Sequence, residues 1–292
     1  MRGWIRWLKT IYKKSCKIYD LSMNVLIGCE ESQAICTEFR KLGHNAYSCD
    51  LQRCSGGHPE WHFNSDIFEV LDNNGGVTQA GDEVHVDKWD LLIAHPPCTY
   101  LAVSGARWLY NKDGSKNEQR WKDLEEGAAF FMKLANANVE RIAIENPIGV
   151  MGKRWRKADQ TIQPWQFGDM AKKLTCLWLK NLPKLEPLYT EEPEGLEYVF
   201  QSGKKNPKWY LDALGQAAKE TAKWVVDNQI DISTPEGKKA KKMYYDEARR
   251  RIRSKTFPGI ARAMARTWGG HPDVSESVMK KIVRESIDEL IC

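Results

Sequence analysis

The chain lacks the patterns that mark most membrane and secreted proteins. Its apolar runs fall well short of the roughly 18 residues that cross a bilayer. Its eight cysteines form no Cys-x-x-Cys pair, and a chain of 292 residues can bury a core that needs no disulfides. We therefore expect a cytoplasmic protein in a reducing compartment, with no membrane partner.

One group of metal-ligand residue types, Cys54, His58 and His62, could bind zinc in principle. Glycine and proline residues between them indicate a loop instead. Our prediction is that the protein binds no metal.

The patterns that bind pyrophosphate are absent as well. The first predicted strand is followed by neither a Gly-x-Gly-x-x-Gly motif nor a phosphate-binding lysine loop. Gly28 instead leads through Cys29, Glu30 and Glu31 into a helix, at the point where Rossmann-type sheets meet a cofactor. Carboxylates here repel a pyrophosphate but accept the cationic amine and sulfonium of S-adenosylmethionine.

Two further acids follow the next predicted strands. Asp50 is placed to accept hydrogen bonds from ribose hydroxyls, and Asp66 is placed to accept one from an adenine amino group. Taken singly, each acid is equally typical of a helix cap or a surface charge. Their shared position at successive strand ends favours a cofactor site.

Strand and helix signals alternate from Asn24 onward, which is typical of a parallel sheet with crossover helices. We predict an α/β fold with a Rossmann-like sheet. The predicted strands cover residues 25–28, 45–49, 90–94, 141–144 and 173–179. The predicted helices cover residues 32–42, 67–71, 124–136, 210–227, 235–253 and 258–268.

A cysteine and a glutamate stand at the ends of two of these strands. Cys98 ends the sequence His-Pro-Pro-Cys, and the two prolines stiffen the chain that presents its thiol. Glu145 ends a short apolar strand and is followed by Asn146 and Pro147. A nucleophile and a proton donor at neighbouring strand ends form a constellation suited to attack on an electron-poor ring.

The net charge of +5 is mild but unevenly distributed. Basic residues gather before residue 18 and between Lys204 and Arg266, a pattern typical of either a phosphate-binding surface or a solvated helical face. We assign nucleic-acid contacts to six of them: Lys204, Lys205, Lys208, Arg250, Arg251 and Arg253.

With an acidic cofactor turn, Pro-Pro-Cys and Glu-Asn-Pro in this order, the chain resembles the DNA cytosine-5 methyltransferases, most of all their short phage-borne members. The resemblance runs from about Asn24 to Gly270. It implies a Rossmann-like methyltransferase that uses S-adenosylmethionine to methylate C5 of a cytosine flipped out of DNA. We expect a monomer that acts on DNA, in the host cytoplasm if a phage encodes it.

The resemblance also implies roles for single residues. Cys98 is expected to attack C6, and Glu145 to act as the acid at N3, with Pro147 where the family has valine. Lys173 and Thr175 stand where the family has arginines and complete the expected catalytic set. The expected cofactor set is Gly28, Cys29, Glu30, Glu31, Ser32, Asp50, Leu51, Asp66, Ile67 and Pro96.

We expect four regions along the chain. Residues 1–22 form an N-terminal extension, with Met23 as an alternative start, and residues 23–184 form the catalytic domain. Residues 185–255 form a small basic target-recognition region. Residues 256–292 comprise a helix that returns to the catalytic domain and a C-terminal tail.

Three alternatives to this interpretation were weighed against the same residues. A related pyrimidine-modifying enzyme would keep the cysteine and glutamate but use another one-carbon donor, since the family's first glycine-rich motif is reduced to Ile27-Gly28-Cys29-Glu30. A catalytically inactive DNA-binding homologue would keep only the scaffold, and the presence of both reacting side chains argues against it. Exocyclic amino methylation is disfavoured, because His95-Pro-Pro-Cys98 lacks the polar acceptor and the aromatic platform of that reaction.

Overall fold

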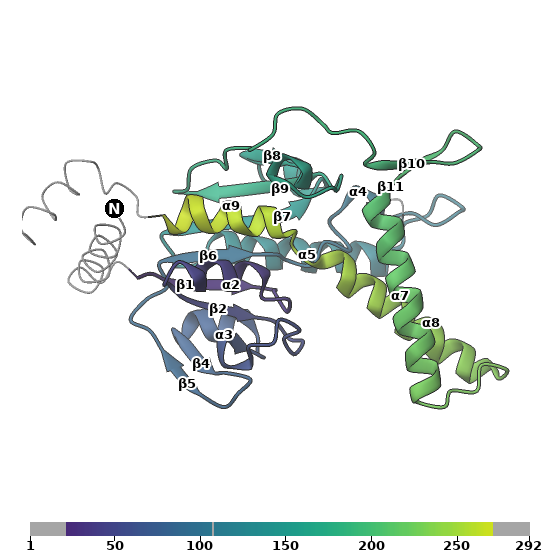
Figure 1. The fold of residues 1–292 in the computed structure, drawn as a ribbon, viewed down its shortest axis with the longest axis horizontal. Coiled ribbons are helices and arrows are strands. Elements are labelled where there is room, and N and C mark those ends of the chain that lie inside the picture. The colour runs from purple at the N-terminus through teal and green to yellow at the C-terminus, as the bar shows by residue number, and fades with distance from the viewer. Residues whose placement is uncertain (1–21, 107, 271–292) are drawn as a thin grey trace, which may run out of the picture.

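The computed structural model describes residues 22–106 and 108–270, which form a mixed α/β fold built on one seven-stranded sheet (Figure 1). Its strands are β1 (Asn24–Gly28), β2 (Asn45–Cys49), β3 (His62–Phe63), β6 (Leu91–Ala94), β7 (Arg141–Pro147), β8 (Gln160–Ile162) and β9 (Thr175–Lys180). They lie in the order β3-β2-β1-β6-β7-β9-β8, and the first five run parallel. β9 is antiparallel to both of its neighbours. The predicted α/β class with a mostly parallel sheet is confirmed.

Helices cover both faces of this sheet. Successive side chains of a strand point to opposite faces, so Ile27 joins Phe39 and Trp268 in one core while Leu26 joins Phe131 in the other. Burial on both faces explains why the central strands read as continuous apolar runs. The first core lies under α2 (Ala34–Lys41) and α9 (Pro258–Gly269), and the second under α3 (Ile67–Asp72) and α5 (Glu118–Ala135).

A helical hairpin projects from one end of the sheet (Figure 1). Its two helices, α7 (Lys208–Asp227) and α8 (Pro235–Ser254), pack against each other, and a short β-ribbon of β10 (Glu197–Val199) and β11 (Lys205–Pro207) precedes them. Trp224 stacks on Tyr244 with ring centroids 4.5 Å apart, and Arg251 pairs with Glu220 at 2.6 Å. Aromatic stacking and this ion pair join the two helices far from the main core.

The remaining elements are short. They are β4 (Gly75–Val77), β5 (Glu83–His85), α4 (Val103–Ala106), α6 (Met151–Arg154) and the 3₁₀ turns η1 (Pro59–Trp61) and η2 (Pro164–Phe167). Within the described ranges no helix has both the length and the apolar composition needed to cross a membrane. The expected N-terminal extension, apart from Ser22, and the expected tail after Gly270 lie outside the described residues.

Candidate active site

The candidate site lies where the winding of the sheet reverses. From β1 the chain builds β2 and β3 on one side, and β6 and β7 follow on the other side. The ends of β1 and β6 are joined by a hydrogen bond in which the His95 N–H donates to the Gly28 carbonyl, at 3.0 Å. The carboxyl ends of strands at such a reversal are where open α/β sheets bind ligands.

The turn after β1 is acidic and tightly held. Cys29 adopts a left-handed conformation with φ of 59°, which turns the chain so that Glu30 and Glu31 are both buried. The Glu30 carboxylate accepts hydrogen bonds from the backbone N–H groups of Ile35, at 2.7 Å, and Cys36, at 3.3 Å. Glu30 therefore satisfies the first turn of α2. Burial raises the pKa of Glu30, and these hydrogen bonds and His95 oppose that rise.

Glu31 differs from its neighbour. Its residue is 6% exposed, and neither carboxylate oxygen has a hydrogen-bond partner within residues 22–106 and 108–270. A buried carboxylate without partners is costly, so Glu31 is the residue of this turn that could hold a ligand. A cation with N–H donors is the matching chemistry.

The other expected cofactor residues surround this turn. Burial, Asp50 and Asp66, in that order, raise the pKa of the Cys29 thiol to about 12, so both acids lie close to it. Asp50 accepts a hydrogen bond from the Gln52 N–H, and Asp66 caps α3 by accepting one from the Phe68 N–H, each at 2.8 Å. One carboxylate oxygen of Asp50 and one of Asp66 thus bind a nearby backbone N–H group, a structural role that single acids often have.

Four further residues of the expected cofactor set line or border the same region. The side chain of Ile67 lies against Gly28, where an added Cβ would approach Ile67 Cδ1 to 3.0 Å. Ser32 is half-buried in the turn toward α2, whereas Leu51 is 78% exposed after β2. Pro96 is buried between His95 and the exposed Pro97, on the segment that leads to Cys98.

The loop after β6 presents Cys98 to solvent. The Asn146 side chain on β7 donates to the Pro96 carbonyl at 2.8 Å, and Arg120 on α5 donates to the Thr99 carbonyl at 2.7 Å. The Cys98 carbonyl accepts hydrogen bonds from the two N–H groups of Leu101 and Ala102. Hydrogen bonds on both sides of the cysteine therefore fix the path of the loop.

Glu145 faces this loop from β7. Its Oε2 lies 3.0 Å from Nδ1 of His95, and the two side chains are 19% and 10% exposed. On β9, Leu177 pairs with Glu145, and Thr175 lies two residues before Leu177. Residues two apart on a strand share a face, so the side chains of Thr175 and Glu145 lie on the same face of the sheet. The structure thus brings together Cys98, Glu145, Lys173 and Thr175, since Lys173 acts electrostatically on both the thiol and the carboxylate.

The Cys98 thiol and the Glu145 carboxyl have opposite pKa shifts. Desolvation by the surrounding protein raises the pKa of the Cys98 thiol most, and the charge of Glu145 raises it further. Lys173 and Arg253 oppose the rise. The positive charge of Lys173 and Arg253 is therefore present near the thiol but is outweighed in the free protein. Desolvation also acts to raise the pKa of Glu145, but His95, Lys173 and Thr175 together lower it.

Three residues of the site were missed in the sequence. His95 holds Glu145, and Asn146 and Arg120 hold the loop of Cys98. His95 belongs to the His-Pro-Pro-Cys sequence and Asn146 to Glu-Asn-Pro. Their positions next to the predicted site residues could therefore have indicated that they belong to the site. Arg120 lies 22 positions after Cys98 and gave no signal, because only the packing of α5 brings it to the loop.

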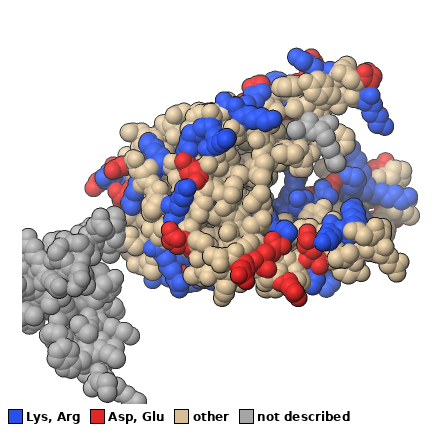
Figure 2. All heavy atoms as spheres, turned by 90° about the horizontal axis from the view of Figure 1, so that it is seen from above, with Lys and Arg blue, Asp and Glu red and all other residues tan. Residues whose placement is uncertain are grey.

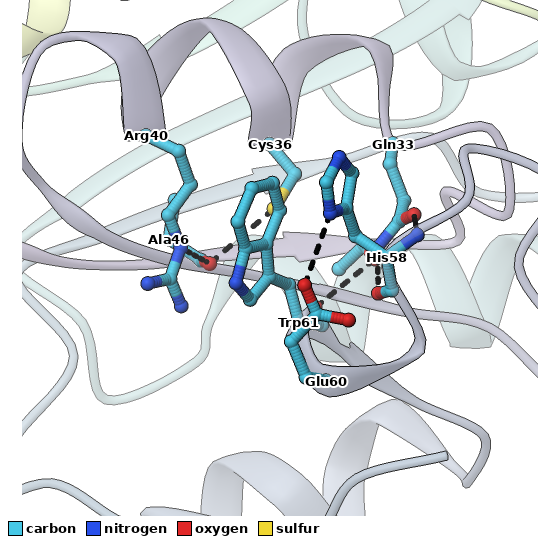
Figure 3. A network of polar contacts seen from close by, with 8 residues as sticks. Gln33, Cys36, Arg40, Ala46, His58, Glu60 and Trp61 are labelled. Atoms are coloured by element: carbon cyan, nitrogen blue, oxygen red, sulfur yellow. Dashed lines mark hydrogen bonds and ion pairs between the residues drawn. The ribbon is translucent and has the colours of Figure 1, made fainter. Parts of the chain in front are cut away.

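The residues of the possible zinc loop have other contacts. His62 places Nδ1 2.9 Å from the Ser48 hydroxyl and Nε2 2.8 Å from the Gln52 carbonyl. His58 stacks on Trp61 and its Nδ1 lies 3.0 Å from Glu60, as the close-up of this region shows (Figure 3). The part of the chain that the structure describes has no group of three or more metal-ligating side chains.

The expected nucleic-acid residues lie on the ribbon, at the start of α7 and on α8. Lys204, Lys205 and Lys208 are exposed, as are Arg250 and Arg253. Arg251 is only half-exposed, because it pairs with Glu220. Figure 2 shows Lys and Arg side chains gathered beside a hollow at the end of the molecule that carries the ribbon and the helical hairpin. Arg253 joins this surface to the cysteine, since its charge acts on the Cys98 thiol.

Comparison with known proteins gives matches among solved structures. Neither a protein-family model nor a curated protein matches the chain. Among solved structures, the chain is similar to an E. coli prophage protein assigned as a DNA modification methyltransferase, with 14% sequence identity and a TM-score of 0.34. The match covers 63% of this chain and 59% of that chain, so it spans less than two thirds of the length of the solved protein.

Proposed function

We propose that the protein is an S-adenosylmethionine-dependent DNA methyltransferase that methylates C5 of a flipped-out cytosine. The observation that carries the proposal is that Cys98 follows β6 and Glu145 lies near the carboxyl end of the adjacent parallel strand β7, at the same edge of the sheet as the turn after β1 that holds the unpartnered carboxylate of Glu31. The strand order, with a single antiparallel strand inserted at β9, is consistent with a Rossmann-like methyltransferase sheet.

The acidic turn fits the proposed cofactor. S-adenosylmethionine supplies an electrophilic methyl group on a sulfonium, and it also carries a cationic amine. Glu31 would accept hydrogen bonds from that amine, because both of its buried oxygens are without partners among the described residues. Asp50 would bind the ribose hydroxyls and Asp66 the adenine amino group, each through the carboxylate at its strand end.

The proposed chemistry uses the two strand-end residues in turn. The Cys98 thiolate forms a bond to C6 of the cytosine, and the electron pair displaced from the ring is accommodated as Glu145 donates a proton to N3. C5 is then an enamine carbon that would take the methyl group as the S–CH₃ bond of the sulfonium breaks and the neutral thioether leaves. Removal of the C5 proton by a base expels the thiolate and restores the ring. The base must leave the duplex, since C5 and C6 are not open to in-line attack within the stack.

The exposed basic residues support DNA as the partner. Phosphate contacts position a protein on DNA, and each one adds a salt-dependent contribution to affinity. Lys204, Lys205 and Lys208 on the ribbon side, with Arg250 and Arg253 on α8, provide such contacts beside the site. Arg251 contributes less in this proposal, because Glu220 already neutralises it.

The test is mass spectrometry of nucleosides from DNA incubated with the protein and methyl-labelled S-adenosylmethionine. Labelled 5-methylcytosine is the expected product. If no label appears but DNA containing 5-fluorocytosine forms a covalent complex with another one-carbon donor, the donor in the proposal is wrong. If the protein binds DNA and gives neither signal, the inactive DNA-binding alternative replaces the enzyme.

A further inference from the structure

His95 contacts both sides of the site, through its backbone on one side and its side chain on the other. It follows β6 directly, and its backbone N–H donates to the Gly28 carbonyl of β1, at 3.0 Å. Its Nδ1 lies 3.0 Å from Oε2 of Glu145 on β7. With 10% of the side chain exposed, the ring is held in place by three neighbouring strands.

The other ring nitrogen identifies the tautomer. Nε2 of His95 is buried and has no hydrogen-bond partner among residues 22–106 and 108–270. A ring with its proton on Nδ1 donates to Glu145 and leaves only a lone pair on Nε2 without a partner, whereas the other tautomer would bury an unpartnered N–H. The charged and titratable groups that act on this pair are Glu30 in the turn after β1, Cys98 after β6, Lys173 before β9 and Cys176 on β9.

We propose that His95 is the positioning residue of Glu145: its Nδ1–H holds Oε2 and thereby leaves Oε1 to face N3 of the cytosine. This inference rests on the proposed function. As the sulfur of Cys98 bonds to C6, the proton on Oε1 moves to N3 and the Nδ1–H stabilises the carboxylate that remains. When the C6–S bond breaks, the N3 proton returns to Oε1, so the acid is ready for the next cytosine.

The first experiment measures single-turnover methyl transfer against pH in wild type, His95→Ala and His95→Asn. The asparagine amide places an N–H donor where Nδ1 stands, so it is the conservative rescue. We expect His95→Ala to slow transfer by roughly ten- to a hundredfold, as loss of an outer hydrogen-bond partner does, and His95→Asn to recover most of that loss. The exposed His85 provides the matched control, and His85→Asn should leave the rate unchanged.

The pH profile separates positioning from a merely structural role. Because His95 lowers the pKa of Glu145, its removal should move the limb of the profile that Glu145 sets to higher pH. A uniformly slower enzyme with an unmoved limb, or His95→Ala with the wild-type rate and profile, would overturn the proposal. Circular dichroism of each variant identifies any that fails to fold, and His95→Asn then carries the test.

A second measurement decides the pairing even if the protein transfers no methyl group. ¹⁵N NMR of the His95 ring reports which nitrogen carries the proton. We expect Nδ1 in wild type, and a shift of the proton toward Nε2 in Glu145→Ala, with the exposed Glu126→Ala as control. A ring protonated on Nε2 in all three proteins would refute the pair. Absence of 5-methylcytosine with an intact pair would instead refute the proposed function.

Discussion

The two sides of the sheet reversal differ in how far their polar groups are already bound. On the β6–β7 side, Asn146 and Arg120 hold the loop of Cys98, and His95 holds Glu145. On the β1–β2 side, Glu30 is bound by α2 but Glu31 is buried with no partner among the described residues. The polar groups of the first side are thus bound within the free protein, whereas the Glu31 carboxylate of the second side has none of its hydrogen bonds made among the described residues.

The difference has a physical consequence. Groups that react must keep one geometry, and hydrogen bonds within the protein provide it before substrate arrives. A group that binds a charged ligand gains most when the protein has not already neutralised it, even though its burial destabilises the free protein. Variants on the β6–β7 side should therefore alter rates, and variants on the β1–β2 side should alter cofactor affinity and stability.

The largest expected effect is that of Cys98→Ser. Methyl transfer should fall by at least about 10³-fold, because a hydroxyl is a far weaker nucleophile than a thiolate at neutral pH. DNA binding should change little, since the loop is held through backbone groups and through Asn146 and Arg120. Labelled-methyl transfer and a gel-shift titration measure the two. A serine variant with substantial turnover would remove Cys98 from the mechanism.

Glu145→Gln should have the next largest effect. The amide can still contact N3 but cannot protonate it, so single-turnover rates should fall by about 10²- to 10⁴-fold, the range of general acid catalysis. Cofactor affinity, measured by calorimetry, should stay within a few-fold of wild type because the change lies on the β6–β7 side. Wild-type rates in this variant would contradict the acid role, and a large loss of cofactor affinity would break the division between the two sides.

Glu31→Gln tests the β1–β2 side through two quantities, the affinity for the cofactor and the stability of the free protein. Affinity for S-adenosylmethionine should fall about tenfold or more, since a hydrogen bond to a charged group is worth about 1.5–3 kcal/mol. The free protein should become more stable, with a melting temperature a few degrees higher, because an uncompensated buried charge is removed. Glu126→Gln on the exposed face of α5 is the control for both. A destabilised free protein would show that Glu31 has a partner within the chain.

The strand ends could be predicted from the sequence because they depend on local features. Gly28, Cys98 and Glu145 each follow a short apolar run, and the direction of parallel strands places such residues at one edge. The antiparallel direction of β9 depends on long-range pairing with β7, so its apolar residues gave no indication of it. The raised pKa of Cys98 likewise depends on packing, since desolvation and then Glu145, which lies far from it in the sequence, raise it.

Lys173→Met should have a moderate effect on the thiol. Lys173 opposes the rise in the pKa of Cys98, so its loss should raise that pKa further and leave less thiolate at neutral pH. Alkylation of Cys98 should be a few-fold slower in the variant at neutral pH, and the two rates should converge as the pH rises well above 9.0, the ordinary thiol value. Peptide mass spectrometry of time points measures it. Equal rates at neutral pH would separate Lys173 from the site.

The smallest expected effect extends the comparison to the DNA surface. Lys205 is exposed on β11, whereas Arg251 on α8 is neutralised by Glu220 at 2.6 Å. Lys205→Ala should reduce the slope of log affinity against log salt by about one, the value for one phosphate contact. Arg251→Ala should change that slope less and destabilise the helical hairpin slightly, because the Arg251 charge is already paired with Glu220 on the neighbouring helix. If the two variants change the slope equally, the ion pair with Glu220 opens when DNA binds, and a partner within the chain does not prevent a residue from binding phosphate.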